Sequence, residues 1–351
     1  MQLSIARTEL ARVVGAVGKV VEARNTIPIL SNLLMSADDG QLRVTGTDLD
    51  IQATASAPAD VTKAGATTVN AKLLGDIVRK AAGDSISIEL KDSRLNVKAG
   101  RSNFKLETLP AGDYPDLAVG TYAAEFDIDL AALFAPVAFA ISTEETRYYL
   151  GGVYFHVVDG TAVAVATDGH RLARNRGHAV PDFAGVIVGR KTVGLLPKGL
   201  VHVSVSDAKI RIQHADITLT AKLIDGTFPD YVRVIPREND KAVTINRDEM
   251  MKAADRVTSV STERGRAVKF SLAPGGISLA VRSDVGEAQD EVAADYTGEP
   301  FDIGFNANYV REVFSVLPAG DVTLHLRDGS APALITGGLE GWDGVLMPMR
   351  V

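Results

Sequence analysis

The chain has 351 residues, of which 46% are hydrophobic and 23% charged, and its formal net charge is −7. This composition excludes a largely disordered chain and is typical of a globular protein of two or three domains, while the acidic balance argues against a protein that grips nucleic acid over most of its surface. The absence of cysteine excludes disulfides, zinc–thiolate sites and cysteine nucleophiles.

The chain begins with MQLSIARTEL, which carries Glu9 and no cleavable apolar segment. No stretch of 18 apolar residues follows anywhere in the sequence. Neither a secretory signal nor a membrane span is indicated, so we expect a cytoplasmic protein.

A unit made of a strand end, a helix cap and an amphipathic helix begins six times along the chain. Its apolar anchors, spaced 57 to 64 residues apart, are Ile5, Val69, Ile128, Val188, Ile245 and Phe305. Four of the six residues that follow the anchors have side chains that cap a helix N-terminus; in chain order the six are Ala6, Asn70, Asp129, Gly189, Asn246 and Asn306. An apolar residue stands five positions after each anchor, namely Leu10, Leu74, Leu133, Val193, Met250 and Val310. Such repetition indicates an extended or closed architecture rather than a globule around one cleft.

The repeat places six helices at 7–22, 71–82, 128–141, 190–198, 247–259 and 307–317. The first has one buried stripe, formed by Leu10, Val13, Val14, Val17 and Val21. We expect the fourth helix to be shorter than its five siblings, because Pro197 ends it. The six segments together carry a net charge of +5, which leaves −12 for the rest of the chain. Helices gathered on one side would form a mildly basic surface, although lysine and arginine are also common on any solvated helix face.

The segments between the helices alternate polar and apolar residues, as half-buried strands do, at 41–45, 85–90, 201–205 and 277–281. Pairs typical of tight turns lie between such runs: Asp39-Gly40, Asp159-Gly160, Gly275-Gly276 and Asp328-Gly329. Similar pentapeptides, GDYPD at 112–116 and GTFPD at 226–230, indicate domain boundaries near 120 and 240. We therefore predict an α+β protein of three similar domains, 1–120, 121–240 and 241–351. Each domain would contain two strand–helix–antiparallel-strand units, with helices on one side and sheets on the other.

The most enzyme-like pair in the sequence is Asp168 and His170. Related pairs stand at corresponding places in the three predicted domains, which indicates a turn rather than catalysis: Thr47-Asp48, Thr167-Asp168 and Ser283-Asp284. Asp48 and Asp50 lack the further carboxylates of a cation site, and phosphate-binding glycine motifs are absent. We expect no catalytic residues, metal or cofactor, and a hydrolase using Asp168 and His170 stays as the alternative.

Two segments suggest a binding role. The C-terminal run GVLMPMRV, at 344–351, is apolar almost to its end, and its methionines form an adaptable surface. The same run would also serve as the closing strand of a sheet. Arg147-Tyr148-Tyr149-Leu150 suits contact with phosphates or bases, and a pair of core-lining tyrosines is an equal alternative.

Five long segments together resemble the bacterial sliding clamp family, the beta subunits of DNA polymerase III. They are RYYLGGVYF (147–155), ATDGHRLA (166–173), FPDYVRVIP (228–236), GFNANYV (304–310) and VLMPMRV (345–351). The resemblance implies a head-to-tail homodimer whose six domains close a ring around duplex DNA, with helices lining the hole. Such a clamp would slide without reading bases, because its weakly basic helices contact only phosphates.

The resemblance also implies sites. The family's partner pocket maps onto Leu150, Thr167, Gly169, His170, Arg171, Leu172, Pro229, Arg233, Val234, Val345, Met347, Pro348, Met349 and Arg350. Short peptides from the replicative polymerase, the clamp loader and repair factors would compete for it. Positions that would contact DNA are Arg24, Lys72, Tyr148 and Tyr149.

The implied dimer interface joins Phe104 and Leu106 of the first domain to Ser259 and Val260 of the third. Ser259 departs from the family's apolar pattern, which we expect to weaken the ring. The segment 128–141, without lysine or arginine, departs from the usual basic lining. Two alternatives follow from these departures: a clamp-like scaffold that binds peptides without closing, and a secondary, phage-borne or drug-tolerant copy of the clamp.

Overall fold

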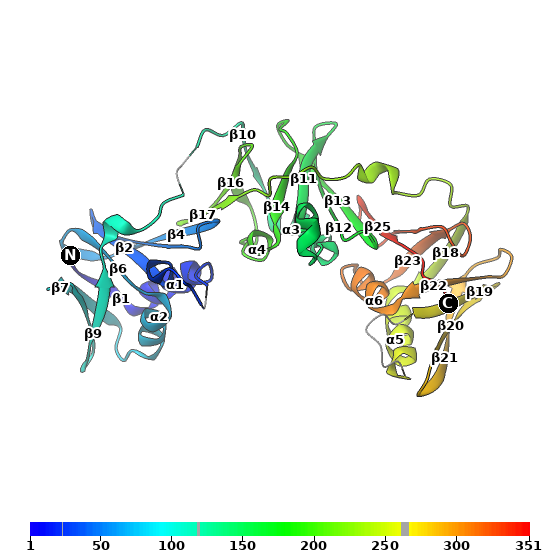
Figure 1. The fold of residues 1–351 in the computed structure, drawn as a ribbon, viewed down its shortest axis with the longest axis horizontal. Coiled ribbons are helices and arrows are strands. Elements are labelled where there is room, and N and C mark those ends of the chain that lie inside the picture. Colours follow the sequence, from blue (N-terminus) through cyan, green and yellow to red (C-terminus); the bar gives the residue numbers. More distant parts are fainter. Residues whose placement is uncertain (23, 118–119, 261–266) are drawn as a thin grey trace. The chain divides into compact units, whose positions relative to one another are not determined.

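The computed structural model describes residues 1–22, 24–117, 120–260 and 267–351 (Figure 1). These residues form six α-helices and 25 strands, so the predicted α+β class is confirmed. They divide into two compact units. Unit 1 contains Met1–Ile128 and Leu200–Leu223, and unit 2 contains Asp129–Gly199 and Ile224–Val351. Within the described ranges, no helix combines the length and the apolar character needed to cross a membrane.

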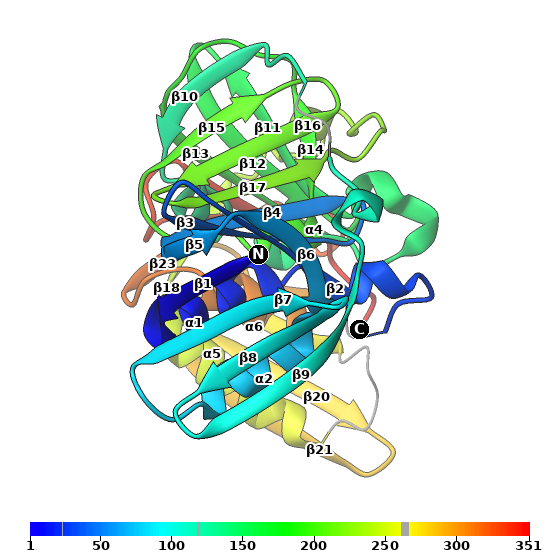
Figure 2. The same ribbon diagram turned by 90° about the vertical axis from the view of Figure 1, so that its left-hand side faces the viewer.

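Unit 1 is built on one antiparallel sheet of 13 strands. In spatial order the strands are β10 (Ala124–Ile128), β15 (Val201–Val205), β16 (Lys209–His214), β17 (Ile217–Lys222), β4 (Ile51–Pro58), β3 (Gln41–Thr47), β2 (Asn32–Asp38), β6 (Gly65–Asn70), β9 (Ser102–Leu109), β8 (Arg94–Ala99), β7 (Ser85–Lys91), β1 (Gln2–Ala6) and β5 (Asp60–Lys63). Figure 2 shows the cyan strands β7, β8 and β9 side by side. Helices α1 (Arg7–Gly18) and α2 (Ala71–Lys80) pack against each other, and α1 also contacts β3 and β4.

Unit 2 contains a second antiparallel sheet, of 12 strands. Their spatial order is β14 (Val186–Gly189), β11 (Gly152–Val158), β12 (Thr161–Thr167), β13 (Arg171–Ala179), β25 (Trp342–Leu346), β24 (Ala333–Thr336), β23 (Asp321–Leu326), β18 (Lys241–Asn246), β21 (Gly286–Asp295), β20 (Gly276–Ser283), β19 (Ala267–Ala273) and β22 (Phe301–Asn306). Its helices are α3 (Leu130–Phe134), α4 (Arg190–Val193), α5 (Arg247–Val257) and α6 (Ala307–Ser315). The second predicted domain is shared between the units, because β17 pairs with β4 and β13 pairs with β25.

The helix starts confirm the predicted caps. Side chains of Asn70, Asp129, Asn246 and Asn306 each accept a hydrogen bond from a backbone N–H in the first turn of the following helix. Ala6 and Gly189 make no side-chain cap. Five of the six apolar residues at the predicted core position are buried, and the sixth, Val193, is half-buried. The predicted capping signal therefore acts at four of the six helix starts, and the apolar core position is at least half-buried at all six.

The predicted helix over 128–141 is wrong. The α-helix there ends at Phe134, and the chain continues as a short 3-10 helix, η3 (Ala138–Ala140). Pro136 explains the break, because proline lacks the N–H that an α-helix needs and its ring clashes with the preceding turn. The fourth helix, α4, is the shortest of the six, as predicted, although α3 is almost as short.

The other predicted helices end early. Helix α1 ends at Gly18 instead of residue 22, where Val21 is only half-buried, and α2 ends at Lys80. Helix α5 passes into a 3-10 turn, η6 (Thr258–Val260), and α6 ends at Ser315. The four predicted strands are all present, within β3, β7, β15 and β20. Helix ends are thus the least accurately predicted feature of the repeat.

Candidate functional site

The apolar part of the predicted partner pocket is assembled in unit 2, where β13 lies beside β25. Leu172 pairs with Val345 in this register. Leu150, Leu172 and Val345 belong to one buried cluster that also contains Phe228 and Tyr231. Tertiary structure thus brings together three predicted pocket residues that are far apart in the sequence.

The more exposed members of the predicted pocket come from two segments. On the C-terminal segment, Met347 is 37% exposed, and its N–H donates to the His170 carbonyl over 2.9 Å. Met349 is half-buried, and its N–H donates to the Gly304 carbonyl over 2.8 Å. Pro348 is half-buried and Arg350 is exposed. These backbone bonds hold the C-terminal segment against the rest of unit 2.

The second segment follows Phe228 and contains the 3-10 helix η5 (Tyr231–Arg233). Pro229, Arg233 and Val234 are exposed here. Arg233 and Val234 line a cavity of about 650 Å³ whose walls also include Ile235, Arg237 and Arg327. The wall also carries Asp230 and Glu238, so this hollow is of mixed charge and includes two residues of the predicted pocket.

The turn at 167–171 forms another part of the predicted pocket. The Asp168 carboxylate accepts hydrogen bonds from the N–H groups of His170 (2.9 Å) and Arg171 (3.0 Å). The Thr167 hydroxyl donates to the Arg171 carbonyl (2.7 Å) and accepts from the Gly169 N–H (3.1 Å). Gly169 has φ +88°, and a Cβ there would lie 2.7 Å from the Arg147 guanidinium. The left-handed backbone conformation favours glycine at this position, and a Cβ would require the Arg147 side chain to move.

The predicted structural role of the Thr-Asp pairs is confirmed in unit 1 as well. Asp48 accepts from the N–H groups of Asp50 (3.0 Å) and Ile51 (2.7 Å), and the Thr47 hydroxyl donates to the Ile51 carbonyl (2.9 Å). Asp50 forms an ion pair with Lys222 at 3.0 Å. In the described parts of the chain, no three His, Asp or Glu side chains cluster as metal ligands would.

Asp168 and His170 are not arranged as a hydrolytic pair. The second oxygen of the Asp168 carboxylate accepts from the Arg171 Nε over 3.1 Å. The His170 ring instead stacks on Tyr309, with centroids 6.2 Å apart. The Asp168 carboxylate therefore bonds to the turn and to Arg171. In a hydrolytic pair it would instead orient the His170 imidazole, which would act as the general base.

Arg171 joins three segments of unit 2 through a side chain that is only 9% exposed. Besides Asp168, its guanidinium donates to the Phe139 carbonyl (2.8 Å) and forms an ion pair with Glu312. It also lies 4.4 Å from the centroid of the Tyr309 ring. Because its nitrogens bond within the protein, Arg171 positions the turn and α6.

The two adjacent tyrosines have different environments. Both belong to the 3-10 helix η4 (Glu145–Leu150), with ring centroids 5.8 Å apart in an edge-on arrangement. Tyr148 is 58% exposed, whereas Tyr149 packs against the buried cluster of Leu150. One tyrosine is free to contact a ligand and the other helps to build the core.

The remaining DNA-contact candidates lie in unit 1. Lys72, in the first turn of α2, and Arg24, after α1, are both exposed. Lys72 lines a cavity of about 720 Å³ between α1 and α2, together with Lys19 and Arg79. This helix pair therefore presents several cations on one surface.

The predicted dimer residues lie beside two open strand edges. Phe104 and Leu106 belong to β9, which pairs fully with β8 but meets β6 only through its last residues. Ser259 is exposed, its hydroxyl donating to the Arg256 carbonyl over 2.8 Å, and the neighbouring Val260 carbonyl accepts from Ser283 over 2.6 Å. Strand β21 pairs with β20 but meets β18 only near its end. Among the described residues, no second strand pairs with β9 over 102–107 or with β21 over 286–293.

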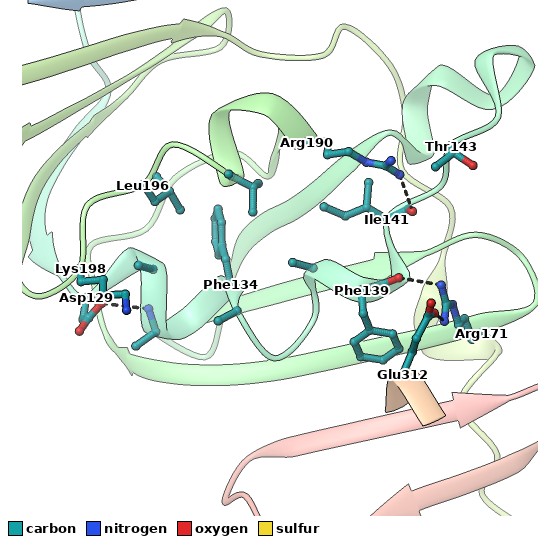
Figure 3. A pocket seen from close by; sticks show the side chains of 16 residues that line it. Asp129, Phe134, Phe139, Ile141, Thr143, Arg171, Arg190, Leu196, Lys198 and Glu312 are labelled. Carbon is teal, nitrogen blue, oxygen red and sulfur yellow. Dashed lines mark hydrogen bonds and ion pairs between the residues drawn. The ribbon is translucent and has the colours of Figure 1, made fainter. Parts of the chain in front are cut away.

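A cavity that the sequence did not predict opens beside α3, η3 and α4, with a volume of about 780 Å³ (Figure 3). Its wall is largely apolar and includes Phe134, Phe139 and Leu196. Figure 3 shows Asp129 and Lys198 at one end of it, and Arg171 with Glu312 at the other. Helices α1 and α2, like α5 and α6, instead pack directly against each other. Pro136 shortens α3 and Pro197 shortens α4, so these two prolines were the sequence signal from which the cavity could have been predicted.

A stack of aromatic side chains packs against the buried cluster. Tyr154 lies between Phe228 and His156, at centroid distances of 4.8 and 4.6 Å. The His156 Nε2 and the Tyr231 hydroxyl share a hydrogen bond of 3.0 Å. Burial lowers the pKa of His156 and raises the pKa values of Tyr154 and Tyr231, because a charged form is poorly solvated there.

The comparisons with known proteins all indicate the same family. Models of the N-terminal, central and C-terminal domains of the DNA polymerase III beta subunit match residues 1–118, 128–230 and 232–350. The beta sliding clamp of Caulobacter vibrioides is 43% identical, and the alignment covers all of both chains.

Two similar solved structures have TM-scores of 0.96. One is the Caulobacter crescentus beta sliding clamp, which is 42% identical, with 100% of this chain and 99% of that chain covered. The other is a sliding clamp from Bartonella birtlesii bound to griselimycin, which is 41% identical, with both chains covered completely.

Proposed function

This chain belongs to the DNA polymerase III beta subunit family, and on that premise we propose that it is a DNA sliding clamp. Two copies would form a ring of six domains, with boundaries at 1–120, 121–240 and 241–351 in each. The ring would encircle duplex DNA and tether the replicative polymerase, making and breaking no covalent bonds. The full-length match to sliding clamps, at 43% identity, is the observation that carries this proposal.

The open edges of β9 and β21 support a head-to-tail dimer. Unpaired strand edges invite pairing with another chain, and here one edge lies in unit 1 and the other in unit 2. Lys98 and Lys105 are exposed on the β8–β9 hairpin, whereas Glu291 is exposed on β21, where Glu287 is paired with Arg282. This opposite charge favours joining unit 1 of one copy to unit 2 of the next.

Exposed cations on the helices support a sequence-independent contact with DNA. Lys72 and Arg24 would contact phosphates, and Tyr148 offers an exposed ring and hydroxyl close to Arg147. Such contacts weaken as salt rises, so the affinity alone would not hold the protein on DNA. Enclosure would provide the retention, and the DNA of a bacterial chromosome would place the protein in the cytoplasm.

We propose that the predicted partner pocket binds short peptides of the polymerase, the clamp loader and repair factors. Leu150, Leu172 and Val345 form an apolar base, and Val234 and Met347 add exposed apolar side chains to the predicted pocket. The griselimycin-bound relative supports ligand binding by this family. Partners that use one pocket would compete, so griselimycin is a suitable probe of the site.

Retention on closed and open DNA tests the clamp. Protein loaded onto nicked circular DNA should stay bound at moderate salt and should be lost within minutes once a restriction enzyme linearises the circle. Equal retention on both forms would contradict enclosure. A persistent monomer in sedimentation at micromolar concentration would favour a scaffold that never closes, and hydrolytic activity abolished by His170→Ala would favour the enzyme alternative.

A charge reversal tests the proposed dimer contact. Lys105→Glu places a negative charge on the β9 edge and should lower the dimer fraction measured by sedimentation, more strongly at low salt. Lys63→Glu is a matched control, because it makes the same change on β5, which is separated from β9 by three strands of the same sheet. Equal dimer fractions in the two variants would contradict the β9 contact.

A further inference from the structure

The methionines of this cysteine-free chain differ sharply in exposure. Of the six, Met1, Met35 and Met250 are buried, and Met251 and Met349 are half-buried. Met347 is the most exposed, at 37%. Thioethers are oxidised according to their access to the oxidant, so Met347 is the first candidate for attack.

Met347 also occupies a functional position. It directly follows β25, and its N–H is held by the His170 carbonyl at 2.9 Å. Val345, two residues earlier, is part of the buried cluster with Leu150 and Leu172. The Met347 backbone is thus anchored two residues away from Val345, which belongs to the apolar base of the proposed pocket.

We propose that Met347 is a modification site, where oxidation by a peroxide converts the thioether to a sulfoxide and weakens peptide binding. The proposal rests on the peptide-binding role put forward above. A sulfur lone pair attacks one peroxide oxygen, the S–O bond forms and the O–O bond breaks. The sulfur loses two electrons and the peroxide is reduced. The transferred oxygen then gives up its proton to the displaced hydroxide, which becomes water and leaves the sulfoxide. The sulfoxide remains on Met347 until a methionine sulfoxide reductase removes the oxygen.

The physical effect follows from the apolar surroundings. A sulfoxide oxygen is a strong hydrogen-bond acceptor, and covering it with an apolar ligand side chain leaves it without a donor. The side chains of Leu172 and Val345 supply no donor. A loss of about tenfold in ligand affinity corresponds to one such unsatisfied polar group. Met349 is less exposed, so its oxidation would follow that of Met347.

Graded hydrogen peroxide tests the site and its effect in one experiment. Peptide mapping by mass spectrometry should show Met347 oxidised several times faster than Met251, with Met35 and Met250 unmodified while the protein stays folded. Calorimetric titration with griselimycin should show affinity falling about tenfold as Met347 is oxidised. Reductase treatment should restore binding, and griselimycin bound beforehand should slow the oxidation of Met347.

Three variants assign the effect to one sulfur. Met347→Leu should give a ratio of affinities before and after peroxide close to one, whatever its starting affinity. Met251→Leu, the matched control, should remain as sensitive to peroxide as the parent protein. Met347→Gln places a polar group at the same position and should bind weakly without any oxidant.

Two results would overturn the proposal: faster oxidation of Met251 than of Met347, or full griselimycin affinity in protein whose Met347 is completely oxidised. Persistent peroxide sensitivity in Met347→Leu would also exclude Met347 as the switch. If the proposed peptide-binding role is wrong, the experiment gives a different result. The untreated protein would then fail to bind griselimycin at all, which would contradict both the proposed pocket and its oxidative control.

Discussion

The turns at 47–51 and 167–171 have the same local structure and different surroundings. Each has a threonine hydroxyl bonded to the carbonyl four residues later, and an aspartate that accepts two backbone N–H groups. Leu49 has φ +80° in the first turn and Gly169 has φ +88° in the second. The backbone conformation therefore does not by itself demand glycine, and Arg147, packed against Gly169, makes the difference.

The surroundings of the second turn link it to distant parts of the chain. Arg171 pairs with Glu312 of α6, and His170 holds Met347 through its carbonyl. In the first turn, the corresponding position holds Ile51, a buried apolar residue. The same local structure thus serves as a simple connection in unit 1 and lies in the proposed partner pocket in unit 2.

Removing the Arg171 side chain should give the largest effect. Arg171→Ala removes the side-chain donor from one Asp168 oxygen and from the Phe139 carbonyl, and should lower the free energy of unfolding by about 3 kcal/mol in urea titrations. Arg12 is the matched control in unit 1, because it also pairs with two carboxylates but is exposed. Arg12→Ala should cost less than about 1 kcal/mol. Similar losses in both variants would show that burial of Arg171 contributes little.

Deleting 349–351 tests whether the C-terminal segment belongs to the proposed pocket. It removes the contact between Met349 and Gly304 but keeps the bond between Met347 and the turn. Griselimycin affinity should fall by at least about 30-fold, the value of one strong anchor residue, while the fold and the dimer persist. Calorimetry measures the affinity, and sedimentation with circular dichroism checks the assembly. Unchanged affinity would remove the C-terminal segment from the pocket.

Placing alanine in each turn tests the role of Arg147. Gly169→Ala adds a Cβ where Arg147 lies, and should cost about 1–2 kcal/mol of unfolding free energy. Leu49→Ala keeps the Cβ that is already tolerated in unit 1, so its cost should stay below about 1 kcal/mol. Thermal unfolding of both variants measures the difference. If the two costs were equal, the close approach to Arg147 would have no energetic consequence.

Acidification should give the smallest of these effects. Burial lowers the pKa of His156, so the folded protein binds this proton less readily than the unfolded chain does. The stabilisation is therefore complete above the ordinary histidine value of about 6.5 and decreases as pH falls below it, by at most about 1.4 kcal/mol per pH unit. Urea unfolding between pH 7.5 and 5.5 measures this slope. His156→Gln should reduce it, and a parent-like slope in His156→Gln would contradict the assignment.

The sequence predicted local structure well where the signal lies within a few residues. Asn70 and Asn246 cap their helices as expected, and the Thr-Asp turns form as expected. The helix over 128–141 was predicted from its anchor and its place in the repeat, and Pro136 outweighed both. A regular repeat thus locates where helices begin more accurately than where they end.

The site was predicted less completely, because its properties depend on packing between distant segments. Sequence similarity predicted Arg171 as a pocket residue, but its burial against Phe139 and Glu312 depends on α6. The adjacent residues Tyr148 and Tyr149 have nearly the same sequence context, and only the core that forms around Tyr149 distinguishes them. Contacts between side chains on different elements leave no pattern among neighbouring residues, so they could not be predicted from the sequence.

By itself, the sequence determined the sixfold repeat, the caps, the strand alternation and the family, since each depends on neighbouring residues or on whole-chain similarity. Tertiary structure decided that the turn at 167–171 meets α6 and the C-terminal segment, and that shortened α3 and α4 leave a cavity beside them. The physical reason is one of range. Hydrogen bonds of caps and turns close within four residues, whereas burial and exposure are set by whichever distant segments fold against them.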